Sequence, residues 1–157
     1  MMKPISVWKQ ELSGGAHAAQ LAALYCCAPE QTPAQATRYE AVLDGLEATF
    51  GPHAEAGLYS APGRTEIGGN HTDHQHGRVL AGSVNIDMIA AAGPNTLGQL
   101  RVQSEGYDLC VIDLNDLAAR KEEENTSAAI LRGECEAFRQ RDRKSTRLNS
   151  SHPYLSR

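Results

Sequence analysis

Aromatic side chains are scarce in this sequence, at 5% of its 157 residues, and tryptophan occurs once. With so few large rings, a folded core must be mainly aliphatic and rich in alanine. The hydrophobic share of 41% and the charged share of 22% are those of one ordinary soluble domain. The composition therefore predicts a single globular unit with an aliphatic core.

Long apolar runs are also lacking. The longest apolar-leaning run, residues 79–93, is too short to span a bilayer and contains Asn85 and Asp87. No basic start followed by an apolar stretch is present, so no secretory signal is predicted. The net charge of −4 gives no electrostatic reason to expect nucleic acid or an acidic lipid surface as a partner. These absences favour a cytoplasmic protein without nucleic-acid or membrane partners.

The four cysteines lack any C-x-x-C spacing, which is the usual mark of a zinc or redox pair. Cys26 and Cys27 are adjacent and could not easily bridge each other. Cys110 is expected in a strand and Cys135 on a helix, both in apolar surroundings. All four are therefore predicted to be reduced thiols.

Apolar residues at helical spacing predict a helix over residues 36–50, ended by Gly51 and Pro52. Its apolar stripe should lie in the core. A weaker helix is predicted over residues 17–25, followed by a loop that Pro29 and Pro33 mark. A third helix should follow a cap at residues 125–127, with four apolar residues on one face. The stripe of the first helix is Tyr39, Val42, Leu43, Leu46 and Phe50, and the face of the third is Ile130, Leu131, Cys135 and Phe138.

Strands are predicted over residues 57–61, 78–92, 99–104 and 108–114, the last two joined as a hairpin. Pro62-Gly63 and residues 93–95 should be turns, and Gly82 a break or bulge within the second strand. The acidic residues 122–124 are expected to be solvated.

The most informative stretch is residues 60–82, SAPGRTEIGGNHTDHQHGRVLAG, with five glycines and three histidines. Glycine weakens the interior of both helices and strands, so this composition is poor for either. It suits a loop that lies close to a ligand and places polar side chains around it.

Ten residues of this stretch resemble, in order and without a gap, the N-terminal signature of galactokinases, which are sugar kinases of the wider GHMP kinase group. Four other positions depart from the usual pattern. Glu66 replaces the usual Asn, Gly68 replaces Ile, Asn70 replaces Glu, and His74 replaces Tyr. The chain therefore resembles a variant branch, and the resemblance extends more loosely from about residue 36 to about residue 140. The matching residues are Pro62, Gly63, Arg64, Gly69, His71, Thr72, Asp73, Gly77, Val79 and Leu80.

The resemblance implies a two-domain α/β (α+β) fold, of which this chain would cover an incomplete N-terminal domain with a mixed sheet and packed helices. It implies ATP-dependent phosphorylation of galactose at the C1 hydroxyl, with ATP and Mg²⁺ as cofactors of a monomeric full-length enzyme. Residues 1–35 would be an extension and residues 36–141 the partial domain.

The same resemblance assigns the site residues. Phosphoryl transfer needs a permanently charged, multidentate donor near the phosphate oxygens, and Arg64 is the candidate, placed in the active site. Asp73 would bind sugar hydroxyls, Asn70 would occupy the position of a sugar-binding Glu, and His71 would line the pocket. Asn70 and Asp73 are three residues apart, so one helical turn would bring them to one side. The amide of Asn70 removes a charge and adds a donor, which should shift the preference for hydroxyl groups.

Two rival functions stay open. His71, Asp73, His74 and His76 form an H-x-D-H-x-H cluster that could bind zinc in a hydrolase. This order differs from the H-x-H-x-D-H of binuclear zinc hydrolases, and no further ligand follows at an obvious spacing, so no metal is predicted. The other rival is a galactokinase-like regulator that senses sugar and ATP without turnover.

Phosphate-binding motifs are absent from the sequence. No glycine- and serine-rich loop precedes a helix, and no G-x-x-x-x-G-K-[ST] is present. The catalytic Asp of the family would lie beyond the resembling region, and Asp108, Asp113 and Asp116 are not substitutes. The chain as written is therefore expected to be inactive as a kinase.

The last 16 residues, from Asp142, have four basic residues, one acid and hardly any apolar content. Within them, RKSTRLNSSH resembles the translation of sequencing-adapter DNA fused to a truncated reading frame. Residues 142–157 are therefore predicted to be a non-native, disordered tail.

Overall fold

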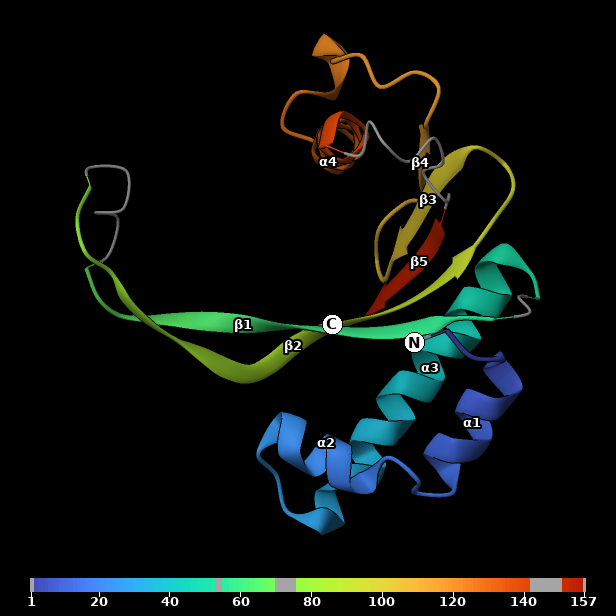
Figure 1. Cartoon of the computed structure of the whole chain (residues 1–157), viewed down its shortest axis with the longest axis vertical. Coiled ribbons are helices and arrows are strands. Elements are labelled where there is room, and N and C mark those ends of the chain that lie inside the picture. The colour runs from blue at the N-terminus through green and yellow to red at the C-terminus, as the bar shows by residue number, and fades with distance from the viewer. Residues whose placement is uncertain (1, 53–54, 70–75, 142–150, 157) are drawn as a thin grey trace.

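A five-stranded sheet runs through the molecule, and helices pack against it (Figure 1). The structure is a computed structural model that describes residues 2–52, 55–69 and 76–141, and the backbone of residues 151–156. In chain order its elements are α1 (Ile5–Ser13), α2 (Ala18–Tyr25), η1 (Pro29–Gln31), α3 (Thr32–Phe50), β1 (Gly57–Gly68), β2 (Leu80–Pro94), β3 (Gln99–Ser104), β4 (Cys110–Asp113), η3 (Lys121–Glu123), α4 (Ser127–Arg141) and β5 (Ser151–Ser156).

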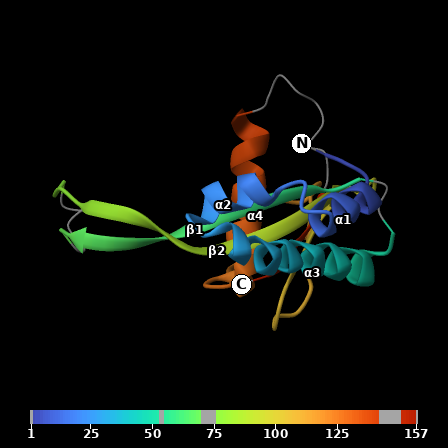
Figure 2. The same cartoon turned by 90° about the horizontal axis from the view of Figure 1, so that it is seen from below.

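The strands lie in the order β1-β2-β5-β3-β4. β1 pairs antiparallel with β2, β2 antiparallel with β5, β5 parallel with β3, and β3 antiparallel with β4. Helices α1, α2 and α3 lie together beside β1 and β2, whereas α4 lies against β4 (Figures 1 and 2). This arrangement of helices and a mixed sheet confirms the predicted α+β class.

Helix α3 is the main cover of the sheet and follows its sequence pattern closely. Its predicted stripe is buried at Tyr39, Val42, Leu43 and Leu46. The helix ends where Gly51 adopts a positive φ of 82°, a conformation that favours glycine. It begins at Thr32, earlier than predicted, so the loop expected at Pro33 is wrong: proline is well tolerated in a first helical turn, where its missing N–H has no partner to lose.

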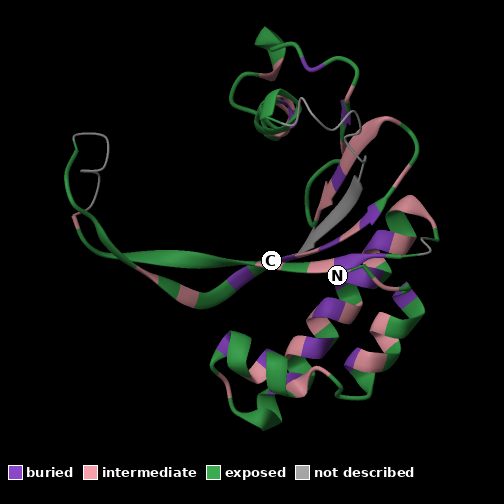
Figure 3. Cartoon of the chain, in the orientation of Figure 1, coloured by how far each residue is buried: buried purple, intermediate pink, exposed green. Residues whose placement is uncertain are grey.

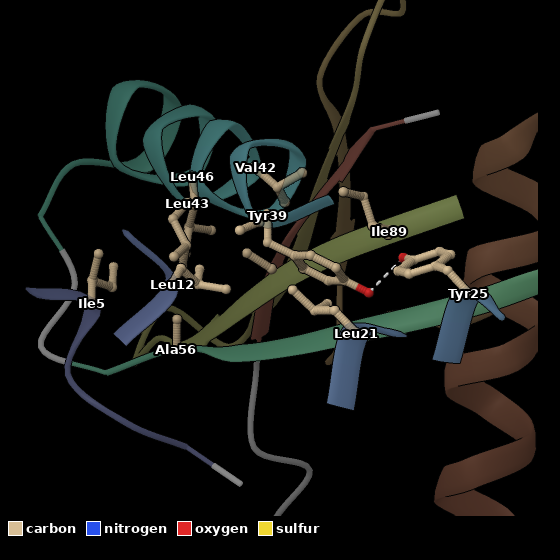
Figure 4. Close-up of a cluster of buried hydrophobic side chains, with 12 residues drawn as sticks. Ile5, Leu12, Leu21, Tyr25, Tyr39, Val42, Leu43, Leu46, Ala56 and Ile89 are labelled. Carbon is tan, nitrogen blue, oxygen red and sulfur yellow. Dashed lines mark hydrogen bonds between the residues drawn. The ribbon is translucent and has the colours of Figure 1, made fainter. Parts of the chain in front are cut away.

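The first 35 residues contribute to the same core. Ile5 and Leu12 of α1 and Leu21 and Tyr25 of α2 are buried among the stripe of α3 and Ile89 of β2 (Figure 4). The sequence analysis predicts no helix at α1, although the apolar residues of α1 recur at helical spacing. Aliphatic and alanine side chains make up most of this core, as predicted, with Tyr25 and Tyr39 as the aromatic exceptions.

Strand β1 is longer than predicted, and β2 has the predicted length but begins and ends two residues later, so it includes Gly93 and Pro94 of the turn expected at residues 93–95. The turn expected at Pro62-Gly63 is wrong, because β1 continues through both residues to Gly68. Since β1 lies at the edge of the sheet, a proline within it need not break a ladder. The register shifts between Pro62 and Arg64 and again between Glu66 and Gly68, and Gly82 lies between these two irregularities, opposite Thr65. The loop predicted for residues 60–82 is therefore strand over much of its length.

The hairpin of β3 and β4 is confirmed, with β4 shorter than expected. Helix α4 packs on β4 through a small cluster of Ile112, Leu117 and Cys135. Of the four apolar residues predicted on its face, Cys135 is buried and Leu131 packs against it, whereas Ile130 and Phe138 are 67% and 60% exposed.

The acidic run before α4 is not wholly solvated as predicted. The Glu123 carboxylate accepts hydrogen bonds of 2.7 and 2.6 Å from the guanidinium of the buried Arg132. Arg132 also donates to the backbone carbonyl of Asp116 at 2.5 Å. This bidentate pair fixes η3 against α4.

The predicted disorder of residues 142–157 does not extend to Ser151–Ser156, whose backbone forms β5 between β2 and β3. The edges of two strands offer rows of unpaired N–H and C=O groups, and any extended segment can satisfy them. Residues 142–150 lie outside the described part of the chain.

All four cysteines are free thiols, as predicted. Burial raises the pKa of the Cys110 and Cys135 thiols. Within the described residues, the helices include none with the length and apolar character needed to cross a membrane.

Candidate functional site

Of the predicted site residues, Arg64 lies on the outer part of the β1–β2 hairpin. We call this part of the hairpin the signature arm and define it as residues 62–69 and 76–86. The arm extends away from the helices and from the rest of the sheet (Figures 1 and 2). None of its described residues is buried (Figure 3). Its surface is therefore open to a ligand or to another part of a protein.

Close backbone approach requires one glycine of the arm, and a second glycine lies at a tight position. A Cβ on Gly69 would lie 2.2 Å from the carbonyl oxygen of Arg78, and Gly69 has a φ of +84°. A Cβ on Gly63 would lie 3.1 Å from Val84 and 3.2 Å from the carbonyl oxygen of Ile86. Both positions belong to the signature, so part of the motif serves to build the hairpin.

Arg64 lies on β1, and its side chain is 74% exposed. Its guanidinium is 3.4 Å from the carboxylate of Glu66, the residue that replaces the usual Asn of the signature. An exposed pair at this distance contributes little energy, so Arg64 can leave Glu66 for an incoming anion. Asn70, His71, Asp73 and His74, and the helical turn predicted for them, lie outside the described residues.

A buried carboxylate lies at the base of the arm. Asp87, 8% exposed, accepts hydrogen bonds from the Tyr25 hydroxyl at 2.6 Å, the Ser60 hydroxyl at 2.6 Å and the Arg38 guanidinium at 2.9 Å. The Tyr25 hydroxyl uses its hydrogen for the bond to Asp87, so it accepts the hydrogen bond from the Tyr39 hydroxyl at 2.9 Å (Figure 4). We call these five residues the Asp87 network.

The network keeps Asp87 charged. Burial raises the pKa of this carboxyl, but the hydrogen bonds from Ser60, Tyr25 and Arg38 together outweigh burial, and the pKa lies below its usual value. Burial and the bond to Asp87 raise the pKa of Tyr25, which therefore stays protonated as a donor. The arrangement is a buried ion pair with its remaining acceptor positions filled by hydroxyl groups.

From the sequence alone, Asp87 is identified only as a charged residue that interrupts an apolar run. Asp87, Ile89 and Ala91 alternate along β2 and are all buried, so they share the face that meets the helices. A lone Asp on an apolar face of a strand must find partners, which is the signal that could have identified it. Its partners could not be named from the sequence, because they come from α2, α3 and β1.

Two hollows are present elsewhere among the described residues. One, of about 300 Å³, lies between α1, α2 and β1 and is lined by Trp8, Leu12 and Tyr39. The other, of about 580 Å³, lies beside α4 and is lined by Arg120, Glu123 and Arg132. Neither is lined by a residue of the signature arm, so neither replaces the arm as the candidate site.

No group of three potential metal ligands is found among the described residues. His71, Asp73 and His74 lie outside them, and His76 is exposed. The prediction that this cluster does not bind metal therefore stays a prediction.

The galactokinase galactose-binding signature matches residues 46–94 of the chain. This range covers the end of α3, β1, the signature arm and β2. No curated protein matches the sequence.

Among solved structures, the chain is similar to galactokinase from Lactococcus lactis, determined in complex with galactose. The TM-score is 0.61 at 18% sequence identity, and the match covers 72% of this chain and 29% of that galactokinase. The chain therefore has the fold of part of a galactokinase and spans less than a third of that protein's length. With the matched signature, this confirms the resemblance to galactokinases.

Proposed function

We propose that this chain is the sugar-binding portion of a galactokinase-like enzyme, which would transfer the γ-phosphate of ATP to the C1 hydroxyl of galactose. The observation that carries the proposal is the match of residues 46–94 to a galactose-binding signature, within which residues 62–69 and 76–86 form an arm without a buried residue. The whole enzyme would be cytoplasmic, because its second substrate is ATP, and the resemblance to galactokinases implies a monomer.

In this proposal Asp73 accepts hydrogen bonds from vicinal sugar hydroxyls, which a carboxylate binds more strongly than a neutral acceptor does. Asn70 and His71 complete the sugar side. Arg64, exposed on the surface of the arm, neutralises charge on the phosphoryl oxygens during transfer.

The residues present do not fit a nucleotide. A phosphate site needs backbone N–H groups at a helix N-terminus, and α4 is preceded by Glu122, Glu123 and Glu124, which repel phosphate. No group of three metal-binding side chains is found among the described residues to hold Mg²⁺. The proposal therefore gives the chain the sugar half of the site, and no step through ATP is assigned to its residues.

The test is titration of the full chain with galactose, observed by saturation-transfer NMR. Asp73→Ala should weaken galactose binding by about 10- to 150-fold, the usual effect of losing a hydrogen bond to a charged group. Asp108→Ala removes an exposed carboxylate away from the arm and should leave the affinity unchanged. Failure of the wild-type chain to bind galactose, or equal affinity in Asp73→Ala, would contradict the proposal.

A further inference from the structure

The signature arm joins the body of the molecule at Asp87. Pro62 faces Asp87 in the β1–β2 pairing, and the next aligned pair is Arg64 with Ser83. The pairing shift therefore lies immediately beyond the Asp87 network. This is the position at which the long hairpin changes from a strand of the packed sheet into a free arm.

Beyond this point, no described residue of the arm is buried, so the arm's packing on the helices does not set its direction. Its direction depends on the last contacts before the shift. Those contacts are the hydrogen bonds of Asp87 to Tyr25 on α2, to Arg38 on α3 and to Ser60 on β1.

We propose that Asp87 is a positioning residue for the sugar site, which sets the angle of the signature arm through its bonds to Tyr25, Arg38 and Ser60. This inference rests on the proposed function, because the arm is taken to carry the sugar-binding residues. Asp87 itself touches neither substrate nor reacting atoms in this proposal.

The length of the arm makes its angle important. A strand rises about 3.3 Å per residue, so Gly69 lies roughly 23 Å along the arm from Pro62. A tilt of about 10° at the base would move that end by roughly 4 Å, whereas a misplacement of about 1 Å is enough to damage a site.

A merely structural role explains the network less well. Well-packed apolar side chains are often as stabilising as a buried ion pair, so stability alone does not call for Asp87. A carboxylate bonded from three elements differs from apolar contacts in fixing directions as well as distances. The network also lies at the pairing shift, where a defined direction has the greatest consequence.

Asp87→Asn tests the inference because it keeps the side-chain shape, removes the charge and replaces one of the two acceptor oxygens with an NH2 donor. Val42→Ala is the control: Val42 is fully buried on the same helix as Arg38 and Tyr39 but is not in the network. Each variant is measured for galactose affinity and for residual dipolar couplings of arm amides, such as those of Thr65 and Ala81, relative to those of α3. Urea unfolding ranks the two variants by stability.

Asp87→Asn should weaken galactose binding at least about tenfold and reduce the arm couplings, with those of α3 retained. Val42→Ala should lower stability while affinity and arm couplings stay within about twofold. Ser60→Ala removes one bond to the same carboxylate and should give an intermediate effect, even where Asp87→Asn folds poorly. Unchanged arm couplings in Asp87→Asn and Ser60→Ala, or equal changes in Val42→Ala, would overturn the inference. Absence of galactose binding by the wild-type chain would instead contradict the proposed function, because the couplings still report the arm.

Discussion

At the scale of single residues, the Asp87 carboxylate links stability to pH. Its folded-state pKa is lowered, so it stabilises the fold above its unfolded pKa, near 3.9. This stabilisation is lost as the pH falls through the lower folded value. Glu11, Asp116 and Glu123 also have lowered pKa values, so acid should weaken the fold at several sites together.

The difference in the free energy of unfolding between the wild type and Asp87→Asn isolates the contribution of Asp87. At neutral pH, Asp87→Asn should lower the free energy of unfolding by about 1–3 kcal/mol, because the half-buried Arg38 guanidinium loses its charged hydrogen-bond partner. As the pH falls through the lowered folded-state pKa of Asp87, the difference should shrink toward zero, since the wild-type carboxyl then also becomes neutral. Urea unfolding followed by circular dichroism from pH 7 to pH 2 measures it. Asp108→Asn, an exposed change, should match the wild type throughout, and a difference for Asp87→Asn that does not vary with pH would refute the assignment.

At the scale of elements, the signature arm depends on one glycine far more than on its neighbour. Gly69→Ala places a Cβ 2.2 Å from the Arg78 carbonyl oxygen at a φ of +84°, whereas Gly68→Ala meets nothing within 4 Å. Gly69→Ala should therefore distort the arm and weaken galactose binding by at least about tenfold. Global stability should change little, because the arm has no buried residue among those described.

Galactose titration and urea unfolding of both variants check this prediction. Gly68→Ala, as the matched control, should keep its affinity within about twofold of the wild type. Equal affinities for the two alanine variants would mean that the hairpin tolerates a side chain at residue 69.

The elements that the sequence predicted are those whose signals are local. The residues that form the stripe of α3 lie within about 20 positions of one another, as do those of the β3–β4 hairpin, and both predictions are confirmed. The turn predicted at Pro62-Gly63 is wrong because this dipeptide is also allowed on an edge strand where the strand register shifts. The Asp87 network could not be predicted, because its bonds join residues 62, 49 and 27 positions apart.

At the scale of the whole molecule, large apolar side chains lie on the surface of several elements, including the signature arm, β2 and α4. On the signature arm and β2 these are Ile67, Leu80, Ile86 and Met88, and Ile86 is 76% exposed. On α4 they are Ile130 and Phe138. Apolar surface of this kind, where it is contiguous, marks interaction sites or favours aggregation.

The sequence contains no phosphate-binding motif, and we therefore expect residues 1–157 to show no galactokinase turnover. Phosphoryl transfer depends on placing two substrates in line, so a sugar side without a phosphate site should give almost none of the rate. Arg64 alone cannot replace the missing loop, because one exposed guanidinium neutralises charge without fixing the nucleotide. The measurement is galactose-dependent release of ADP by chain purified free of host kinases, with Arg64→Ala as the matched control. Turnover that exceeds background and disappears in Arg64→Ala would show that these residues contain a working phosphate site, and the assignment of only the sugar half would then be wrong.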